Sequence, residues 1–155
     1  MDVYLNPGNS GFASIIKSDY VDKTGLIALL NKTIGTTRKL TCVTRPRRFG
    51  KSFAAQMLCA YYDKTCDSHS LFAGYEIADN PTYEEHIGKY DVIYWDMAGV
   101  KPYTERYSRL VPFLIESLKK ELKEQYPDVE VSEDLPAGER RHTCRIRRIH
   151  GGMQL

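Results

Sequence analysis

A short apolar run followed by a basic loop and a helix is the feature that most constrains how this chain can fold. Residues 40–44 (Leu-Thr-Cys-Val-Thr) are β-branched and apolar, which is typical of a buried strand. Pro46 and Gly50 interrupt this pattern, so residues 45–52 are expected to form a loop. Over residues 53–62 a helical spacing places four side chains on one face: Phe53, Met57, Ala60 and Tyr61. The sequence therefore predicts a strand, a loop and a helix in direct succession.

The loop ends in Gly50-Lys51-Ser52, residue types that surround phosphate in nucleotide-binding loops. The glycine lets the backbone approach the ligand, the lysine reaches the β- and γ-phosphate oxygens, and the serine hydroxyl ligates Mg²⁺. The following helix N-terminus points N–H groups at the anion. The full pattern has a glycine where this chain has Arg45, so an incidental basic loop is the alternative interpretation.

Several side chains near this tripeptide have two interpretations each. Arg47 and Arg48 would lie near phosphates or reach a partner's nucleotide site, or they would belong to a solvated basic loop. Asp22 and Lys23 would border a base or ribose pocket, although helix capping explains Asp22 without any ligand. We expect the catalytic residue to be Lys51 and the Mg²⁺ ligand to be Ser52. The expected nucleotide-binding residues are Arg47, Arg48, Phe49, Gly50, Lys51 and Ser52.

The remaining chain extends an alternation of strands and helices. A helix is expected over residues 26–30, a second strand over 91–96 and a long helix over 107–126. In the long helix Pro112 fits only the first turn, so the regular part is expected to begin near Val111. Its apolar row is Leu110, Leu114, Leu118 and Leu122, and its expected water-facing residues are Glu116, Lys119, Lys120, Glu121 and Lys123. The sequence thus predicts an α/β fold with a parallel sheet flanked by helices.

Composition narrows the function classes. The chain has 155 residues, 42% of them hydrophobic, which suits one domain or a piece of a larger one. It lacks a signal-peptide pattern and any apolar run of the roughly 18 residues that cross a bilayer. The four cysteines and four histidines show no metal-ligand spacing, so we expect free thiols, no structural zinc and a cytoplasmic location without membrane contact.

With these residues in view, the chain resembles the AAA-ATPase-like proteins of bacteria, which often carry a PD-(D/E)XK-type nuclease domain further along. The resemblance covers roughly residues 1–134. Residues 45–52 of this chain read Arg-Pro-Arg-Arg-Phe-Gly-Lys-Ser, which is the form that the phosphate-binding loop takes in that family. The resemblance therefore implies an arginine at position 45, where the general pattern has a glycine. The other matching segments are Tyr4–Asn9, Tyr20–Ile27, Cys59–Asp63, Leu71–Gly74 and Tyr90–Tyr94.

The resemblance implies a P-loop core that binds ATP and Mg²⁺, a parent activity of ATP hydrolysis, and homo-oligomers as a frequent state. Nucleic acid would be reached through a nuclease domain that this chain does not contain. Such a core also needs an apolar strand that ends in an acidic pair. Asp96 ends the second predicted strand but precedes Met97, which makes it a weak candidate for the metal-site aspartate.

Beyond Asp134 the family pattern stops. Residues 135–155 hold five basic residues and one acidic residue, whereas residues 1–134 hold 17 basic and 19 acidic residues. Residues 135–155 also contain no run of four apolar residues. We interpret this tail as a frameshift or truncation product, with an evolved basic arm as the alternative. The core would then be incomplete at its C-terminus, hydrolyse ATP poorly, and leave the segments 40–44 and 91–96 unpaired and exposed.

Two other function classes remain open from the sequence. A P-loop kinase would use the same loop but needs an acceptor pocket with an acidic base, and no such group stands out. A non-catalytic nucleic-acid-binding protein would use the arginines of the loop and the tail. The slightly acidic body and a tail without aromatic residues count against this second alternative.

Overall fold

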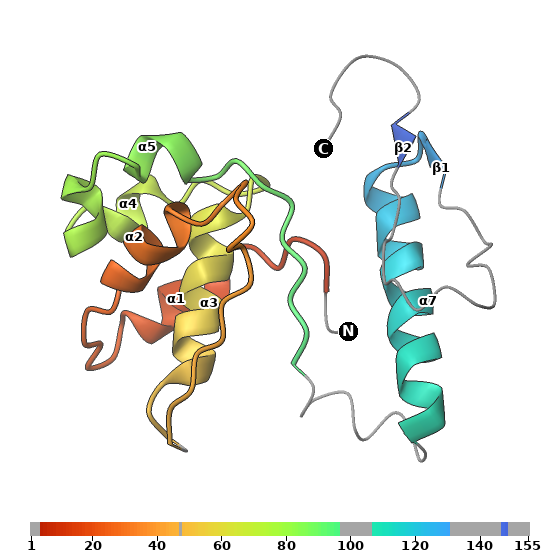
Figure 1. Ribbon diagram of the computed structural model, residues 1–155, viewed down its shortest axis with the longest axis horizontal. Helices are drawn as coiled ribbons and strands as arrows, with labels where there is room; N and C mark the ends of the chain where they lie inside the picture. The colour runs from red at the N-terminus through yellow and green to blue at the C-terminus, as the bar shows by residue number, and fades with distance from the viewer. Residues whose placement is uncertain (1–3, 47, 97–106, 131–146, 149–155) are drawn as a thin grey trace. The chain divides into compact units, whose positions relative to one another are not determined.

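The computed structural model describes residues 4–46, 48–96, 107–130 and 147–148. The chain divides into two compact units (Figure 1). The helical unit is Asn6–Tyr94, and the α7 unit is Met1–Leu5 together with Trp95–Leu155. The elements of the helical unit are α1 (Ser10–Ile15), α2 (Gly25–Asn31), α3 (Lys51–Tyr62), α4 (His69–Phe72), the 3-10 helix η1 (Glu76–Asp79) and α5 (Tyr83–His86). Those of the α7 unit are α7 (Tyr107–Gln125), β1 (Val129–Glu130) and β2 (Arg147–Arg148).

The predicted α/β core with a parallel sheet is wrong for the described residues, which are mostly helix and irregular chain. The sheet they contain is the antiparallel pair of β1 and β2, each two residues long. Asp63 and Tyr90 form an isolated parallel bridge that does not extend into a ladder. The predicted strand segments are not strands, because β-branched residues favour a strand only where a neighbouring strand pairs with them.

Both of these segments instead expose apolar side chains. Leu40 is 92% exposed and Val43 is 42% exposed in the first segment, and Ile93 is 50% exposed in the second. We expected unpaired, exposed segments on the ground that their neighbouring strands were missing. The exposure of these side chains is confirmed.

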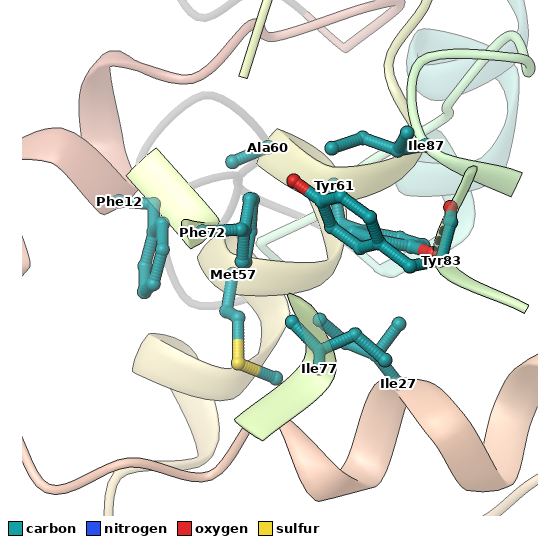
Figure 2. Close-up of a cluster of buried hydrophobic side chains, with 9 residues drawn as sticks. All are labelled: Phe12, Ile27, Met57, Ala60, Tyr61, Phe72, Ile77, Tyr83 and Ile87. Atoms are coloured by element: carbon teal, nitrogen blue, oxygen red, sulfur yellow. Dashed lines mark hydrogen bonds between the residues drawn. The ribbon is translucent and has the colours of Figure 1, made fainter. Parts of the chain in front are cut away.

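The core of the helical unit is built from side chains of every helix in that unit. Helix α1 packs against α3, while η1 contacts both α2 and α5. Phe12 of α1 stacks on Phe72 of α4 with ring centroids 5.0 Å apart, and Tyr61 meets Phe72 edge-on. Figure 2 shows the whole cluster, which consists of Phe12, Ile27, Met57, Ala60, Tyr61, Phe72, Ile77, Tyr83 and Ile87.

Helix α3 is the central element of this core and confirms the predicted helix, which begins two residues earlier than expected. Met57, Ala60 and Tyr61 are fully buried, as their spacing predicted. Phe53 belongs to the same sequence pattern but is 49% exposed. The buried Tyr61 hydroxyl donates to the Tyr83 carbonyl at 2.9 Å, so its polar end is satisfied inside the core (Figure 2).

A polar hub joins the N-terminal loop to the end of α3. Asp63 is fully buried. One carboxylate oxygen accepts the Gly8 N–H at 2.7 Å, and the other accepts the N–H and hydroxyl of Thr65 at 2.8 and 2.7 Å. The Asn9 amide donates to the Asp67 carbonyl at 2.9 Å. These hydrogen bonds join two irregular segments of the chain, residues 6–9 and 63–67.

In the α7 unit the N-terminal segment packs on α7. Tyr4 and Leu114 are both buried and form an apolar cluster with Leu110 and Phe113. Glu121 was predicted to face water, which is wrong: one carboxylate oxygen accepts the backbone N–H groups of Tyr4 and Leu5 at 2.9 and 2.7 Å. None of the described helices combines the length and apolar character needed to cross a bilayer.

Helix α7 also differs from expectation at its start. It begins at Tyr107 and runs through Pro112, which lies inside the helix rather than in its first turn. Leu114 and Leu122 of the predicted apolar row are buried, whereas Val111 is 57% exposed. The leucine spacing therefore predicted the buried face of α7, although the proline misplaced its first turn.

Candidate functional site

The basic loop leads directly into α3 through two residues with positive φ. Gly50 is the N-cap of α3 with φ of 74°, a conformation that glycine adopts without steric cost. Arg48 has φ of 67°, which strains a residue with a Cβ. The Gly50 carbonyl accepts the N–H of Ala54 at 2.9 Å, so the helix starts regularly at Lys51. No side chain caps α3, which leaves its N-terminal N–H groups without a side-chain acceptor.

Lys51 turns back over the loop that precedes it. Its ammonium donates to the carbonyl of Arg45 at 2.5 Å and to that of Pro46 at 3.0 Å. The side chain is exposed, and so is that of Ser52 in the first turn of α3. The lysine thus closes the loop on itself through hydrogen bonds to two backbone carbonyls.

A pocket of about 490 Å³ lies against this loop. One part of its lining is apolar and comes from α2, the segment 40–44 and the loop: Leu26, Leu29, Val43 and Phe49. The cations in the lining are Lys23, Arg45 and Lys51, and the carboxylates are Asp22 and Glu76. The volume lies in the range of small-molecule sites, and an apolar part with a few charged groups is typical of them.

The segment before α2 forms one wall of the pocket and is fixed on η1. The Asp22 carboxylate accepts the N–H of Thr24 at 2.8 Å and that of Glu76 at 3.0 Å. Partial burial raises the pKa of Asp22, but these N–H groups more than offset it, so the pKa lies below the usual 3.8. The Asp22 carboxylate therefore links the start of α2 to η1 through hydrogen bonds. Thr24 is the N-cap of α2, but no side chain makes a cap hydrogen bond there.

The predicted site residues have different outcomes. Gly50, Lys51 and Phe49 line the pocket, and Phe49 is 60% exposed. Arg47 lies outside the described residues. Asp96 is exposed and belongs to the α7 unit, whereas the loop belongs to the helical unit. Within the described ranges, no group of three or more His, Cys, Asp or Glu side chains is placed to hold a metal ion.

Sequence reasoning missed Glu76 as a pocket residue. It lies 54 positions after Asp22 and carries no motif. The hydrogen bond from its N–H to Asp22 and the packing of η1 on α2 bring it to the pocket. Its carboxylate oxygens lie 3.3 and 3.5 Å from where a Cβ on Gly25 would be. The glycine thus makes room for this carboxylate, a relation that no local pattern reveals.

A family model described as a predicted AAA-ATPase matches residues 7–150, which is most of the chain. This chain belongs to that AAA-ATPase-like family. We predicted that the family pattern ends at Asp134, but the match of the family model continues to residue 150. Beyond Asp134 the structure describes only the two residues of β2. The boundary at Asp134 stays a prediction. No curated protein and no solved structure matches the chain.

The described cysteines of this AAA-ATPase-like chain are free thiols, as predicted. Cys42 is exposed, whereas Cys59 is buried in α3. Burial, with a contribution from the charge of Asp63, raises the pKa of the Cys59 thiol to about 11. Since the thiolate is the reactive form, Cys59 is an inert core residue.

Away from the pocket, His69 forms an exposed charge cluster. Its Nδ1 lies 2.6 Å from an Asp67 carboxylate oxygen and its Nε2 lies 3.6 Å from Glu84. The hydrogen bond with Asp67 is the main cause that raises the pKa of His69 above its usual 6.5. A raised folded-state pKa means that the pair stabilises the fold fully below about 6.5, and that this contribution is lost as pH rises through the folded-state pKa.

We therefore expect the His69 ring to titrate above 6.5 by NMR. Asp67→Asn should move the midpoint down, toward the usual value, and Glu84→Gln should move it less because that carboxylate is a weaker cause. A midpoint at or below 6.5 in the wild type, or a larger shift in Glu84→Gln, would contradict the assignment.

Proposed function

We propose that this AAA-ATPase-like chain binds ATP with Mg²⁺ in the pocket beside the loop. The observation that carries the proposal is that Lys51 and the uncapped N-terminus of α3 border a 490 Å³ pocket lined by further cations and apolar side chains. A nucleotide needs a cationic end for its phosphates and an apolar surface for its base. Family membership supports the same chemistry.

Each residue of the loop has a distinct expected role. Lys51 would leave the carbonyls of Arg45 and Pro46 and donate to phosphate oxygens, stabilising the charge at the γ-phosphate. Gly50 would keep the backbone close to the phosphates, because its φ of 74° and missing side chain leave that approach open. Arg47, Arg48 and the backbone of Phe49 would complete the cradle.

The Ser52 hydroxyl fits a Mg²⁺ ligand, since it is an exposed oxygen in the first turn of α3. Bound Mg²⁺ would neutralise phosphate charge. We further propose that turnover is slow, because the sequence offers no apolar strand ending in an acidic pair. Asp22, an acid that lines the pocket, already accepts two backbone N–H groups.

The test is the thermal unfolding midpoint with and without Mg²⁺–ATP. A ligand that binds only the native state adds about 2.7 kcal/mol at 100 times its Kd. For a chain of this size we expect the midpoint to rise by roughly 5–10 °C. Lys51→Ala should abolish the rise, whereas Lys32→Ala, outside the pocket, should keep it.

A clear melt with no ATP-dependent rise in the wild type would refute the proposal. Strong, salt-dependent DNA binding that Lys51→Ala leaves intact would then favour a nucleic-acid-binding role. Equal rises in the wild type and Lys51→Ala would place the nucleotide at another site.

A further inference from the structure

Lys23 brings a second lysine to the loop from a distant part of the sequence. Its ammonium donates to the Phe49 carbonyl at 3.5 Å. It also lies 2.8 Å from the point that a Cβ on Gly50 would occupy. The absence of a side chain on Gly50 therefore leaves space for the Lys23 ammonium at the residue that opens α3.

The residues on both sides of Lys23 hold its backbone in place. Asp22 accepts the Glu76 N–H at 3.0 Å, and the Thr24 hydroxyl oxygen accepts the Ile77 N–H at 3.2 Å. Thr24 is fully buried, so this second hydrogen bond is shielded from water. Two adjacent N–H groups of η1 thus bind the residues before and after Lys23, which fixes the segment from which this lysine reaches the loop.

The pocket around Lys23 has a small excess of positive charge, because its lining holds three cations and the two carboxylates of Asp22 and Glu76. Lys23, Arg45 and Lys51 line the same pocket, and none of them forms an ion pair with a described residue. The contacts of both lysines with the loop are to backbone carbonyls. Because no described carboxylate pairs with these three cations, they remain available to bind a polyanion.

We propose that Lys23 binds the polyphosphate of the nucleotide as a second cation, opposite Lys51. This inference rests on the proposed function and adds a ligand preference to it. Two lysines that converge on one loop favour a nucleoside triphosphate over a monophosphate, because only the longer phosphate chain offers charge to both. The segment before α2 is then part of the phosphate site rather than only a helix start.

The experiment measures Kd for Mg²⁺–ATP and for AMP by isothermal titration calorimetry on the full chain. Lys23→Met removes the charge and keeps the length of the side chain. We expect it to weaken ATP about tenfold, the lower end for a charged hydrogen bond, and to change AMP less than about twofold. Lys23→Arg should keep most of the ATP affinity, and the matched control Lys32→Met should keep all of it.

The outcomes separate this inference from the proposed function. If Lys51→Met removes ATP binding while Lys23→Met does not change it, the inference is wrong and the proposed function stands. Equal weakening of ATP and AMP in Lys23→Met would also overturn it. A wild type that binds neither nucleotide refutes both. If Lys23→Met unfolds, Lys23→Gln replaces it under the same criteria.

Discussion

Replacing Phe12 by alanine should destabilise the helical unit by about 3–5 kcal/mol, the cost of truncating a buried phenylalanine. The side chain is fully buried, stacks on Phe72 and meets Tyr20 edge-on at 5.4 Å. It is the buried residue through which α1 packs on α3. Small domains are stable by only about 5–15 kcal/mol, so this one change should remove a large fraction of that stability.

Urea unfolding followed by far-UV circular dichroism measures this effect. Phe53→Ala is the matched control, since it removes the same side chain from α3 where it is 49% exposed. We expect the control to cost less than about 1 kcal/mol. Similar losses in the two variants would mean that Phe12 is not the core residue described above.

Asp63→Ala should cost about 3 kcal/mol although it removes few apolar contacts. The substitution leaves the N–H groups of Gly8 and Thr65 without their acceptor, and a buried group left unpaired costs about 1–3 kcal/mol. It should also speed hydrogen exchange at both amides, because the N-terminal loop is released from the end of α3.

Two further variants sharpen this test. Asp63→Asn keeps one acceptor oxygen but turns an NH₂ group toward a donor, so we expect a smaller loss than for alanine. Asp19→Ala removes an exposed carboxylate and should change stability by less than about 0.5 kcal/mol. Asp63→Ala with the stability of the wild type would show that the polar hub does not hold the loop.

Helices α2, α3 and α7 were predictable because their signal is local, whereas α1, α4, η1 and α5 were not predicted. The spacing of Met57, Ala60 and Tyr61 fixes both the helix and its buried face. The parallel sheet predicted from residues 40–44 and 91–96 was wrong, because an apolar, β-branched pattern forms a strand only when a neighbouring strand pairs with it. The hub around Asp63 was missed for a related reason. Asparagine, proline and glycine near the N-terminus predict turns, but not the distant carboxylate that their N–H groups reach.

The residues of the candidate site likewise fall into those that a local motif indicated and those that depend on distant contacts. Gly50 and Lys51 were singled out from their order in the sequence, and both line the candidate pocket. Lys23 was expected to border a base or ribose pocket, whereas its ammonium contacts a loop carbonyl 26 residues away, which no local pattern indicates. Glu76 reaches the pocket through a hydrogen bond to Asp22 and through the packing of η1 on α2. Such relations between distant residues leave no trace in a single sequence.

The hydrogen bonds of Asn6 hold the first residue of the helical unit next to residues near its last one. Its N–H donates to the Val92 carbonyl at 2.7 Å, its side-chain oxygen accepts the Val92 N–H at 2.7 Å, and its amide donates to Asp91 at 2.9 Å. The unit therefore spans one continuous stretch whose ends are fastened together. A stretch of this kind can be excised, transplanted or circularly permuted as a block, because joining its ends requires no rearrangement of what lies between them.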